Sequence, residues 1–168
     1  MLRRRLATVA LIGLIVATIG CDQVSKRVAS AHLADSPSRS FLGDAVRLQY
    51  AENRGGFLSL GADLPEWART AIFSVGTAIA LVAYVISALT LPLDRVAAVG
   101  LCLLFAGGLS NLTDRLLHGR VIDFLNIGVG PLRTGIFNIA DVAVMLGAAV
   151  LISAYFRTTR EPSSGGPS

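Results

Sequence analysis

The sequence predicts a mainly α-helical membrane protein with four transmembrane helices, a small sheet on the outer membrane face and a short interfacial helix. Two observations predict this class. Hydrophobic residues make up 53% of the 168-residue chain and charged residues only 15%, whereas about a quarter of a soluble domain is charged. The apolar residues gather into long runs, and the mean hydropathy is +0.63. We therefore expect the bilayer to surround most of the chain.

Four apolar segments can span a bilayer, although the first and the fourth need flanking residues to complete the crossing. A hydrocarbon core about 30 Å thick needs roughly 20 helical residues. The fourth segment contains one charged residue, Asp141. The final stretch, TTREPSSGGPS, is polar and rich in Gly, Pro and Ser, which predicts a disordered cytoplasmic tail over residues 158–168. The remainder is predicted to be one integral-membrane domain, residues 1–157, with spans at about 6–22, 69–91, 95–113 and 136–156.

The first segment ends in TIGCDQVSK, residues 18–26, which resembles a bacterial lipoprotein signal peptide with Cys21 as the mature N-terminus. However, Thr18 stands where such signals commonly carry Leu, and three more spans follow. We interpret the segment as a permanent first helix and expect Cys21 to be dispensable. The other cysteine, Cys102, also lies in an apolar run, and no Cys or His cluster predicts a disulfide, a metal site or another cofactor.

Basic residues predict the orientation of the chain. Arg3, Arg4 and Arg5 precede the first span, which places the N-terminus in the cytoplasm, and four crossings return the C-terminus there. Lys26 and Arg27 run against this rule, because they directly follow the first span. The two long connections then lie on the outer side. The positive charges are spread along the chain, which argues against a nucleic-acid partner.

The outer connections contain their own elements. Residues 45–53, AVRLQYAEN, alternate apolar and polar side chains and predict a strand, and residues 120–128, RVIDFLNIG, predict a second. PEWARTAIF predicts a helix with Pro65 in its first turn and Trp67 at the depth of the membrane interface.

Two aspartates lie among apolar neighbours at the same predicted depth, near the outer boundary. Asp123 follows the third span in VIDF, and Asp141 lies inside the fourth. A carboxylate in hydrocarbon costs about 3 kcal/mol or more, so its presence indicates a bonded partner or a function. Two carboxylates held close together share one proton, and such a pair hydrolyses peptides when one member activates water and the other protonates the substrate.

Further polar residues accompany this pair. Asn111 and Arg115 are four residues apart, and Asn138 precedes Asp141 by three, so each pair shares a helix face. Asp22 and Lys26 are also four apart, which predicts a local ion pair at the end of the first helix. The remaining polar positions near these segments are Asn53, which precedes two glycines and predicts a turn, and Asp114.

Taken in chain order, the motifs that contain these polar residues resemble those of lipoprotein signal peptidase (signal peptidase II), over roughly residues 6–156. The resemblance implies an intramembrane aspartic endopeptidase with Asp123 and Asp141 as its catalytic pair. It implies that Asn53, Asn111, Arg115 and Asn138 line the site, and that Asp22, Lys26 and Asp114 give structural support. The motifs that carry the resemblance are DQVSK, NRGGF, GGLSNLTDR, VIDF and FNIADVAVMLG.

The resemblance also implies a substrate and a place in the cell. The family removes signal peptides from diacylglyceryl-modified prolipoproteins, just before the lipidated cysteine. We accordingly expect a monomer in the bacterial cytoplasmic (inner) membrane, with prolipoproteins and membrane lipid as partners, an outer β-cradle and an active site at the outer face. One position departs from the family pattern: Phe57 follows Asn53 by four residues instead of five, so the loop is one residue shorter.

Two other functions fit parts of the pattern. A small proton- or cation-coupled transporter would use Asp141 as its carrier site, although this leaves the second aspartate unexplained. A membrane scaffold would use both aspartates as polar contacts between helices. A Ser or Cys nucleophile is poorly supplied with a base, because His32 and His118 both lie in polar surroundings outside any catalytic motif.

Overall fold

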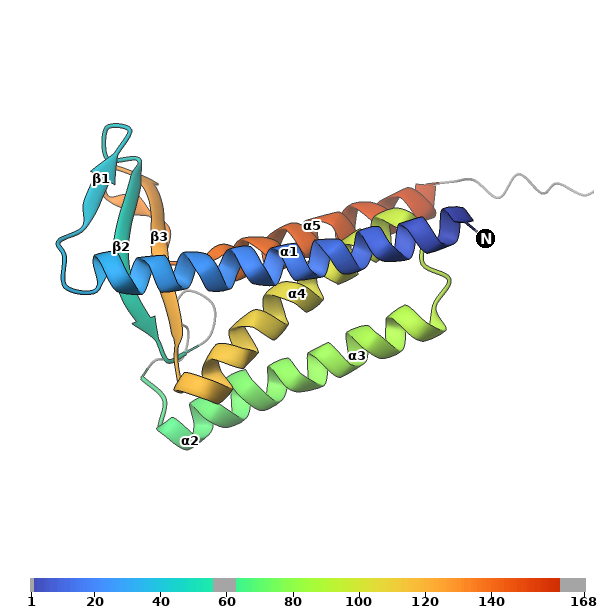
Figure 1. Cartoon of the computed structure of the whole chain (residues 1–168), viewed down its shortest axis with the longest axis horizontal. Helices are drawn as coiled ribbons and strands as arrows, with labels where there is room; N and C mark the ends of the chain where they lie inside the picture. Colours follow the sequence, from blue (N-terminus) through green and yellow to red (C-terminus); the bar gives the residue numbers. More distant parts are fainter. Residues whose placement is uncertain (1, 56–62, 161–168) are drawn as a thin grey trace, which may run out of the picture.

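The computed structural model describes residues 2–55 and 63–160, and Figure 1 shows their arrangement. Long helices lie side by side, and the sheet covers one end of them. The N-terminus and the last turn of the final helix lie at the opposite end. In chain order the elements are α1 (Leu2–Leu33), β1 (Arg39–Phe41), β2 (Val46–Asn53), α2 (Glu66–Arg69), the π-helical turn η2 (Thr70–Val75), α3 (Gly76–Thr90), α4 (Arg95–His118), β3 (Val121–Val129), β4 (Leu132–Arg133) and α5 (Ile139–Arg160).

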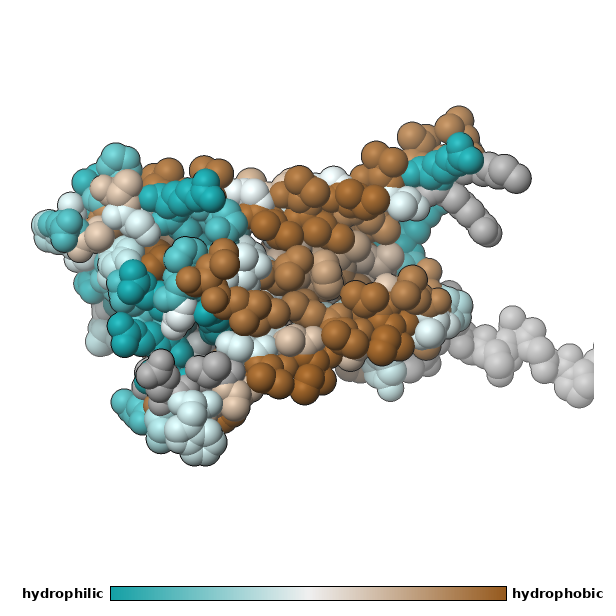
Figure 2. Space-filling model, turned by 60° about the horizontal axis from the view of Figure 1, so that its bottom comes forward, coloured by the Kyte–Doolittle hydropathy of each residue, from teal (hydrophilic) through white to brown (hydrophobic). Residues whose placement is uncertain are grey.

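Within the described residues, four helices are long and apolar enough to cross a membrane, as the sequence predicts. They are α1, the continuous helix made of α2, η2 and α3, then α4 and α5. Their apolar side chains form a broad surface over the helices, while hydrophilic side chains gather at the sheet end (Figure 2). The molecule therefore presents a hydrocarbon-facing belt and a polar end beside it.

The helices extend beyond the apolar runs. α1 continues to Leu33, well past residue 22, because its later residues are buried by protein contacts instead of lipid. Ala29 and Leu33 pack with Phe124 of the sheet in one apolar cluster. α5 ends at Arg160, so the helix includes the first residues of the segment expected to be a tail, and residues 161–168 lie outside the described part of the chain.

The helix predicted after Pro65 opens the second membrane helix. Arg69 donates its backbone N–H to the Pro65 carbonyl at 3.0 Å, and α2 then passes directly through η2 into α3. Trp67 is 75% exposed on this first turn. Its position beside the start of an apolar helix suits the membrane interface, where Trp side chains are enriched.

The two predicted strands form β2 and β3 of an antiparallel sheet with the order β1-β2-β3-β4. Val46 pairs with Ile127 at one end of this ladder and Asn53 pairs with Val121 at the other, with a register shift between Leu48 and Ala51. The last turns of α1 pack against this pair of strands. The sheet is thereby fixed to the same end of the bundle at which α4 ends and α5 begins.

Glycines allow α4 and α5 to pack closely. A Cβ atom on Gly147 would lie 2.7 Å from the carbonyl oxygen of Gly100 and 2.8 Å from the backbone nitrogen of Leu104. A Cβ atom on Gly107 would collide with the carbonyl oxygen of Ala140. Because real Cβ contacts of this length do not occur, the two backbones can approach each other this closely only because residues 107 and 147 are glycines.

We predict that Gly147→Ala lowers the free energy of unfolding by about 1–3 kcal/mol, the usual cost of overpacking. Thermal unfolding of the purified protein in detergent measures the effect. Gly13→Ala is the matched control, because a Cβ there meets nothing within 4 Å and Ala favours a helix by about 1 kcal/mol over Gly. Equal melting temperatures for the two variants would contradict the prediction.

Candidate active site

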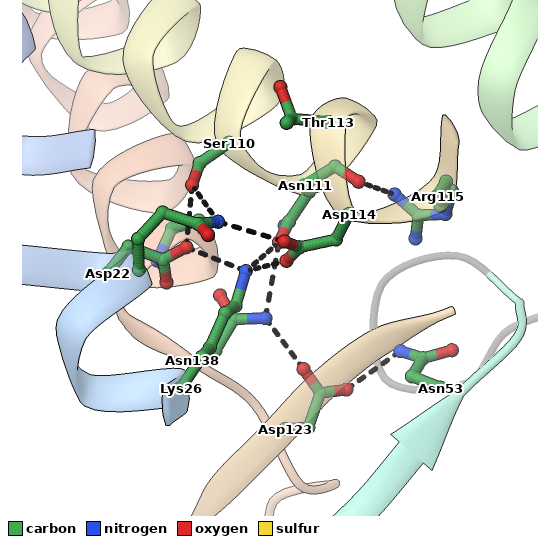
Figure 3. Close-up of polar contacts among 12 residues, drawn as sticks. Asp22, Lys26, Asn53, Ser110, Asn111, Thr113, Asp114, Arg115, Asp123 and Asn138 are labelled. Carbon is green, nitrogen blue, oxygen red and sulfur yellow. Dashed lines mark hydrogen bonds and ion pairs between the residues drawn. The ribbon is translucent and has the colours of Figure 1, made fainter. Parts of the chain in front are cut away.

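The two aspartates come from different elements and are both buried. Asp123 lies on β3 and is 1% exposed, and Asp141 lies in the first turn of α5 and is 6% exposed. The register places Asn53 diagonally across from Asp123 on the same face of the sheet, because Asp123 pairs with Ala51. Asn53 Nδ2 accordingly donates a hydrogen bond of 2.8 Å to Asp123 Oδ2 (Figure 3).

Asn138 joins the two carboxyl groups. Its side-chain Nδ2 donates to Asp123 Oδ1 at 2.6 Å, and its backbone N–H donates to Asp141 Oδ2 at 3.2 Å. The Asp141 N–H returns a bond of 2.9 Å to Asn138 Oδ1. This reciprocal pair is a capping box, which starts α5 at a defined residue. Asn111 completes the contacts by donating from Nδ2 to Asp141 Oδ1 at 2.9 Å.

The environment of Asp123 favours its protonated form. Burial, with a smaller contribution from the negative charge of Asp141, raises the pKa of Asp123 to about 6. The hydrogen bonds from Asn53 and Asn138 oppose this rise in pKa. Asp123 can therefore gain or lose a proton close to neutral pH, as a group engaged in acid–base catalysis needs to do.

A buried lysine lies beside the aspartates and connects the helices around them. Lys26 Nζ lies 2.6 Å from Asp22 Oδ2 and 2.6 Å from Asp114 Oδ2, and it donates to Asn111 Oδ1 at 2.8 Å. Lys26 is 4% exposed and Asp22 is fully buried. The ion pair predicted between Asp22 and Lys26 is present, but it is part of a larger cluster. Lys26 also contacts Asp114 and Asn111, which lie on α4.

Asp22 also reaches the start of α5. Its Oδ1 accepts the Ala140 N–H at 2.8 Å, and its Oδ2 accepts the Ser110 hydroxyl at 2.7 Å. A carboxylate at a helix N-terminus satisfies an otherwise unpaired N–H and interacts favourably with the helix dipole. One side chain of α1 thereby fixes the first turn that carries Asp141.

Arg115 holds the turn that follows β2. Its Nη2 donates to the Gly55 carbonyl at 2.7 Å, and the Gly55 N–H donates to Asn53 Oδ1 at 2.9 Å. The orientation of Asn53, and through it that of Asp123, is thus supported from α4. The shorter loop predicted to end at Phe57 lies partly outside the described residues, which stop at Gly55 and resume at residue 63.

An apolar hollow of about 490 Å³ opens beside the site. Asn111, Arg115 and Asp141 lie in its lining, which is otherwise formed by side chains of η2, α3, α4 and α5. The apolar part includes Ile72, Phe73, Leu81, Tyr84, Val144 and Met145. An apolar peptide segment in this hollow would bring its backbone next to a buried carboxylate.

The structure brings together all nine residues that the sequence singled out. It adds two that sequence reasoning missed: Gln23 donates to Ser110 Oγ at 3.0 Å and to Asp114 Oδ1 at 2.8 Å. The capping box was also missed, although an Asn three residues before an Asp at the start of an apolar run is its recognisable pattern. Among the described residues, no three His, Cys, Asp or Glu side chains converge as metal ligands would.

Fold and site together define a multi-pass α-helical membrane protein that keeps two buried carboxyl groups at the boundary between its apolar belt and its polar end. Comparison with known proteins identifies the family more closely. The family model described as signal peptidase (SPase) II matches residues 14–157. The chain therefore belongs to the signal peptidase II family.

Individual proteins agree with this assignment. The lipoprotein signal peptidase of Paraburkholderia phymatum is 33% identical over 150 residues, which are 89% of each chain. The lipoprotein signal peptidase of Yersinia pestis is 32% identical over 151 residues, covering 90% of this chain and 89% of the other. A solved structure of a bacterial membrane enzyme superposes with a TM-score of 0.83 at 26% identity, covering 95% of this chain and 94% of the other.

We predict that Lys26→Met destabilises the protein by about 3–5 kcal/mol, because it leaves two buried carboxylates without their cation. Asp114→Asn is the matched variant. It leaves Lys26 paired with Asp22, one charge against one, so its cost is expected to be clearly smaller. Thermal unfolding in detergent compares the two, and a larger loss for Asp114→Asn would contradict this account of the network.

The raised pKa of Asp123 predicts a pH dependence of stability. An unfolded Asp titrates near pH 4, whereas Asp123 titrates near 6 in the folded protein. Between these values the folded state binds the proton more tightly, so this contribution to stability is complete below about pH 4 and is lost as pH rises through 6. The melting temperature of wild type relative to Asp123→Asn should therefore fall over this interval and level off above it. Asp35→Asn, at an exposed position, should leave the wild-type profile unchanged.

Proposed function

We propose that this chain cleaves the signal peptides of lipoprotein precursors with Asp123 and Asp141 as its catalytic pair. Membership of the signal peptidase II family supports the reaction, and its relatives carry the name lipoprotein signal peptidase. One geometric observation carries the assignment of the pair. Asn138 donates to Asp123 from its side chain and to Asp141 from its backbone, so both buried carboxyl groups face a single site.

The proposed reaction needs one ionised and one protonated carboxyl group. The ionised carboxylate removes a proton from water, the resulting hydroxide attacks the scissile carbonyl carbon, and the other carboxyl protonates the carbonyl oxygen. As this intermediate collapses and the C–N bond breaks, the carboxyl that took the proton from water passes it to the leaving amine, and a hydroxyl of the intermediate returns a proton to the other carboxylate. The pair titrates as a unit. Burial raises the pKa of Asp123 to about 6, which brings its protonation closer to physiological pH than that of an ordinary Asp.

Asparagine side chains position the pair in this proposal. Asn53 and Asn138 donate to Asp123, and Asn111 donates to Asp141. Neutral amide donors orient a carboxylate without the strong stabilisation of its charge that a directly bonded cation gives. Arg115 supports Asn53 through Gly55, while the ion network of Asp22, Lys26 and Asp114 keeps the helices in place.

The hollow beside Asp141 suits the proposed substrate. Its lining is mostly apolar, with Asn111, Arg115 and Asp141 at the site and Thr77 on α3 as polar members, which fits an apolar signal segment that enters from the bilayer. The diacylglyceryl chains of the precursor would remain in the membrane and set the depth of the cysteine. Cleavage just before that cysteine then occurs at the boundary of the apolar belt, where water is available.

We also propose that the chain acts as a monomer in the bacterial inner membrane, with both termini in the cytoplasm. The Arg3–Arg5 cluster favours a cytoplasmic N-terminus. Figure 1 supports the common location, since the N-terminus and the last turn of α5 lie at the end opposite the sheet. With this orientation the sheet and the aspartate pair lie on the outer side, where lipoprotein signal peptides end.

Replacing either aspartate tests the proposal. Asp123→Asn and Asp141→Asn should each abolish cleavage of a diacylglyceryl-modified prolipoprotein, with a loss of at least about 10⁴-fold as for other essential acid–base groups. A gel-shift assay in detergent or proteoliposomes measures cleavage, and thermal unfolding verifies that the variants fold. The exposed Asp35→Asn is the control with the same chemical change.

Two outcomes of the same assay would contradict the proposal. Substantial turnover by a folded Asp123→Asn or Asp141→Asn variant would remove that residue from the mechanism. An unlipidated precursor should be cleaved much more slowly than the lipidated one, and equal rates would show that the lipid does not set the position of the substrate.

A further inference from the structure

A second hollow, of about 370 Å³, lies at the sheet end of α4 and differs from the first in its chemistry. It is bordered by the end of β2, the α2–η2 turn, the last turn of α4 and the start of β3. Among the described residues, its polar lining consists of Arg54, Arg69, Ser74, Arg115, His118 and Arg120.

Positive charge exceeds negative charge among the described residues that line this hollow. Four of the residues in its lining are arginines, and none of the described lining residues is acidic. Arg54 and Arg120 share one carboxylate, Glu52, at 3.9 Å and 3.3 Å. Both guanidinium groups remain accessible, with side chains 60% and 40% exposed. A further anion placed between them would reduce the repulsion among these like charges.

Arg115 lines this hollow and also the hollow beside Asp141. Its Nη2 donates to Gly55, while its Nε is buried and has no hydrogen-bond partner within the described structure. A buried donor without an acceptor is unfavourable. A ligand that carries several anionic oxygens would bring further acceptors to this cluster of guanidinium groups.

The surroundings favour a lipid over a soluble anion. Leu116, which lines the hollow, is 70% accessible, and two apolar side chains on the same helices, Leu117 and Ile72, are 71% and 53% accessible. Trp67, two residues before Arg69, is 75% exposed. The hollow thus combines arginines with exposed apolar side chains, as expected where the apolar surface of the helices meets the hydrophilic sheet end. Lipid phosphates lie at this level of a membrane, and their acyl chains would cover the apolar flanks.

We propose that this arginine-lined hollow binds the phosphate group of an anionic phospholipid. Arg54, Arg69 and Arg120 contact the phosphate oxygens, and guanidinium groups suit this role because they pair with phosphate through two parallel N–H bonds. The acyl chains lie along Leu116 and Ile72 in the bilayer. The site is separate from the catalytic pair and requires no cleavage reaction, although it places a membrane lipid against Arg115 at the edge of that pair.

Trp67 provides a local probe, because it is the only tryptophan in the chain. The full-length protein is reconstituted in phosphatidylcholine vesicles that contain an equal mole fraction of either brominated phosphatidylglycerol or brominated phosphatidylcholine. Bromine quenches Trp fluorescence only on contact. We expect stronger quenching by the anionic lipid, and each arginine that contacts the phosphate should contribute about a fivefold preference, from about 1 kcal/mol per basic residue.

Three variants define the site. Arg54→Gln/Arg120→Gln should lose most of the preference for the anionic lipid, whereas Arg54→Lys/Arg120→Lys keeps the charge and should retain much of it. Arg27→Gln removes one exposed positive charge from α1, outside the hollow, and should leave the preference unchanged. Thermal unfolding shows whether each variant is folded, and the Lys variant tests the site if the Gln variant is not.

Several results would overturn the proposal. Equal quenching by the two brominated lipids in wild type would show that no anionic lipid is selected. A loss in Arg27→Gln as large as in the double Gln variant would indicate general surface charge. Removal of the preference by millimolar inorganic phosphate would identify a soluble-anion site. If lipid preference is absent and the double Gln variant instead slows cleavage only of precursors with acidic residues after the cysteine, the hollow binds the substrate.

Discussion

The arrangement of the helices depends on one buried ammonium group. Lys26 Nζ lies within 2.8 Å of oxygens from Asp22, Asp114 and Asn111, which come from α1 and α4. Asp22 then accepts the Ala140 N–H, so the same cluster extends to the start of α5. A buried ion is tolerated only when its charge is balanced and its hydrogen bonds are made. A shift of α1 along α4 would leave these charges without partners, and the cluster therefore fixes the relative heights of three helices.

The fixed relative heights of the helices decide which groups contact the two aspartates. Asn111 contacts the ammonium group on one side and Asp141 on the other, so the Lys26 cluster reaches the carboxyl pair only through an amide. Direct contact with a cation would hold a carboxylate ionised, whereas neutral amides orient it and leave its protonation responsive to burial. The pKa of Asp123 near 6 is consistent with this difference. The connected path of hydrogen bonds runs through Lys26, Asn111, Asp141, Asn138, Asp123 and Asn53.

The parts of this architecture that could be predicted from sequence are those governed by local patterns. Apolar runs predicted the four helices, and alternation predicted β2 and β3. The extension of α1 to Leu33 was not predicted, because the hydropathy signal ends where burial passes from lipid to protein. β1 and β4, of three and two residues, are too short to show a period. Gln23 and Ser110 resemble ordinary polar residues, and only their contacts across α1 and α4 give them a place in the network.

The position of Arg115 explains how a water-dependent reaction can proceed beside an apolar substrate segment. Arg115 lines both hollows, one largely apolar and next to Asp141, the other polar and rich in arginine. A guanidinium group stays charged at any physiological pH and therefore remains hydrated where it is accessible. On the proposed mechanism the signal segment occupies the apolar hollow, while water approaches from the hydrophilic sheet end. The peptide bond cleaved would then lie beside Asp141, which is part of the lining of that hollow.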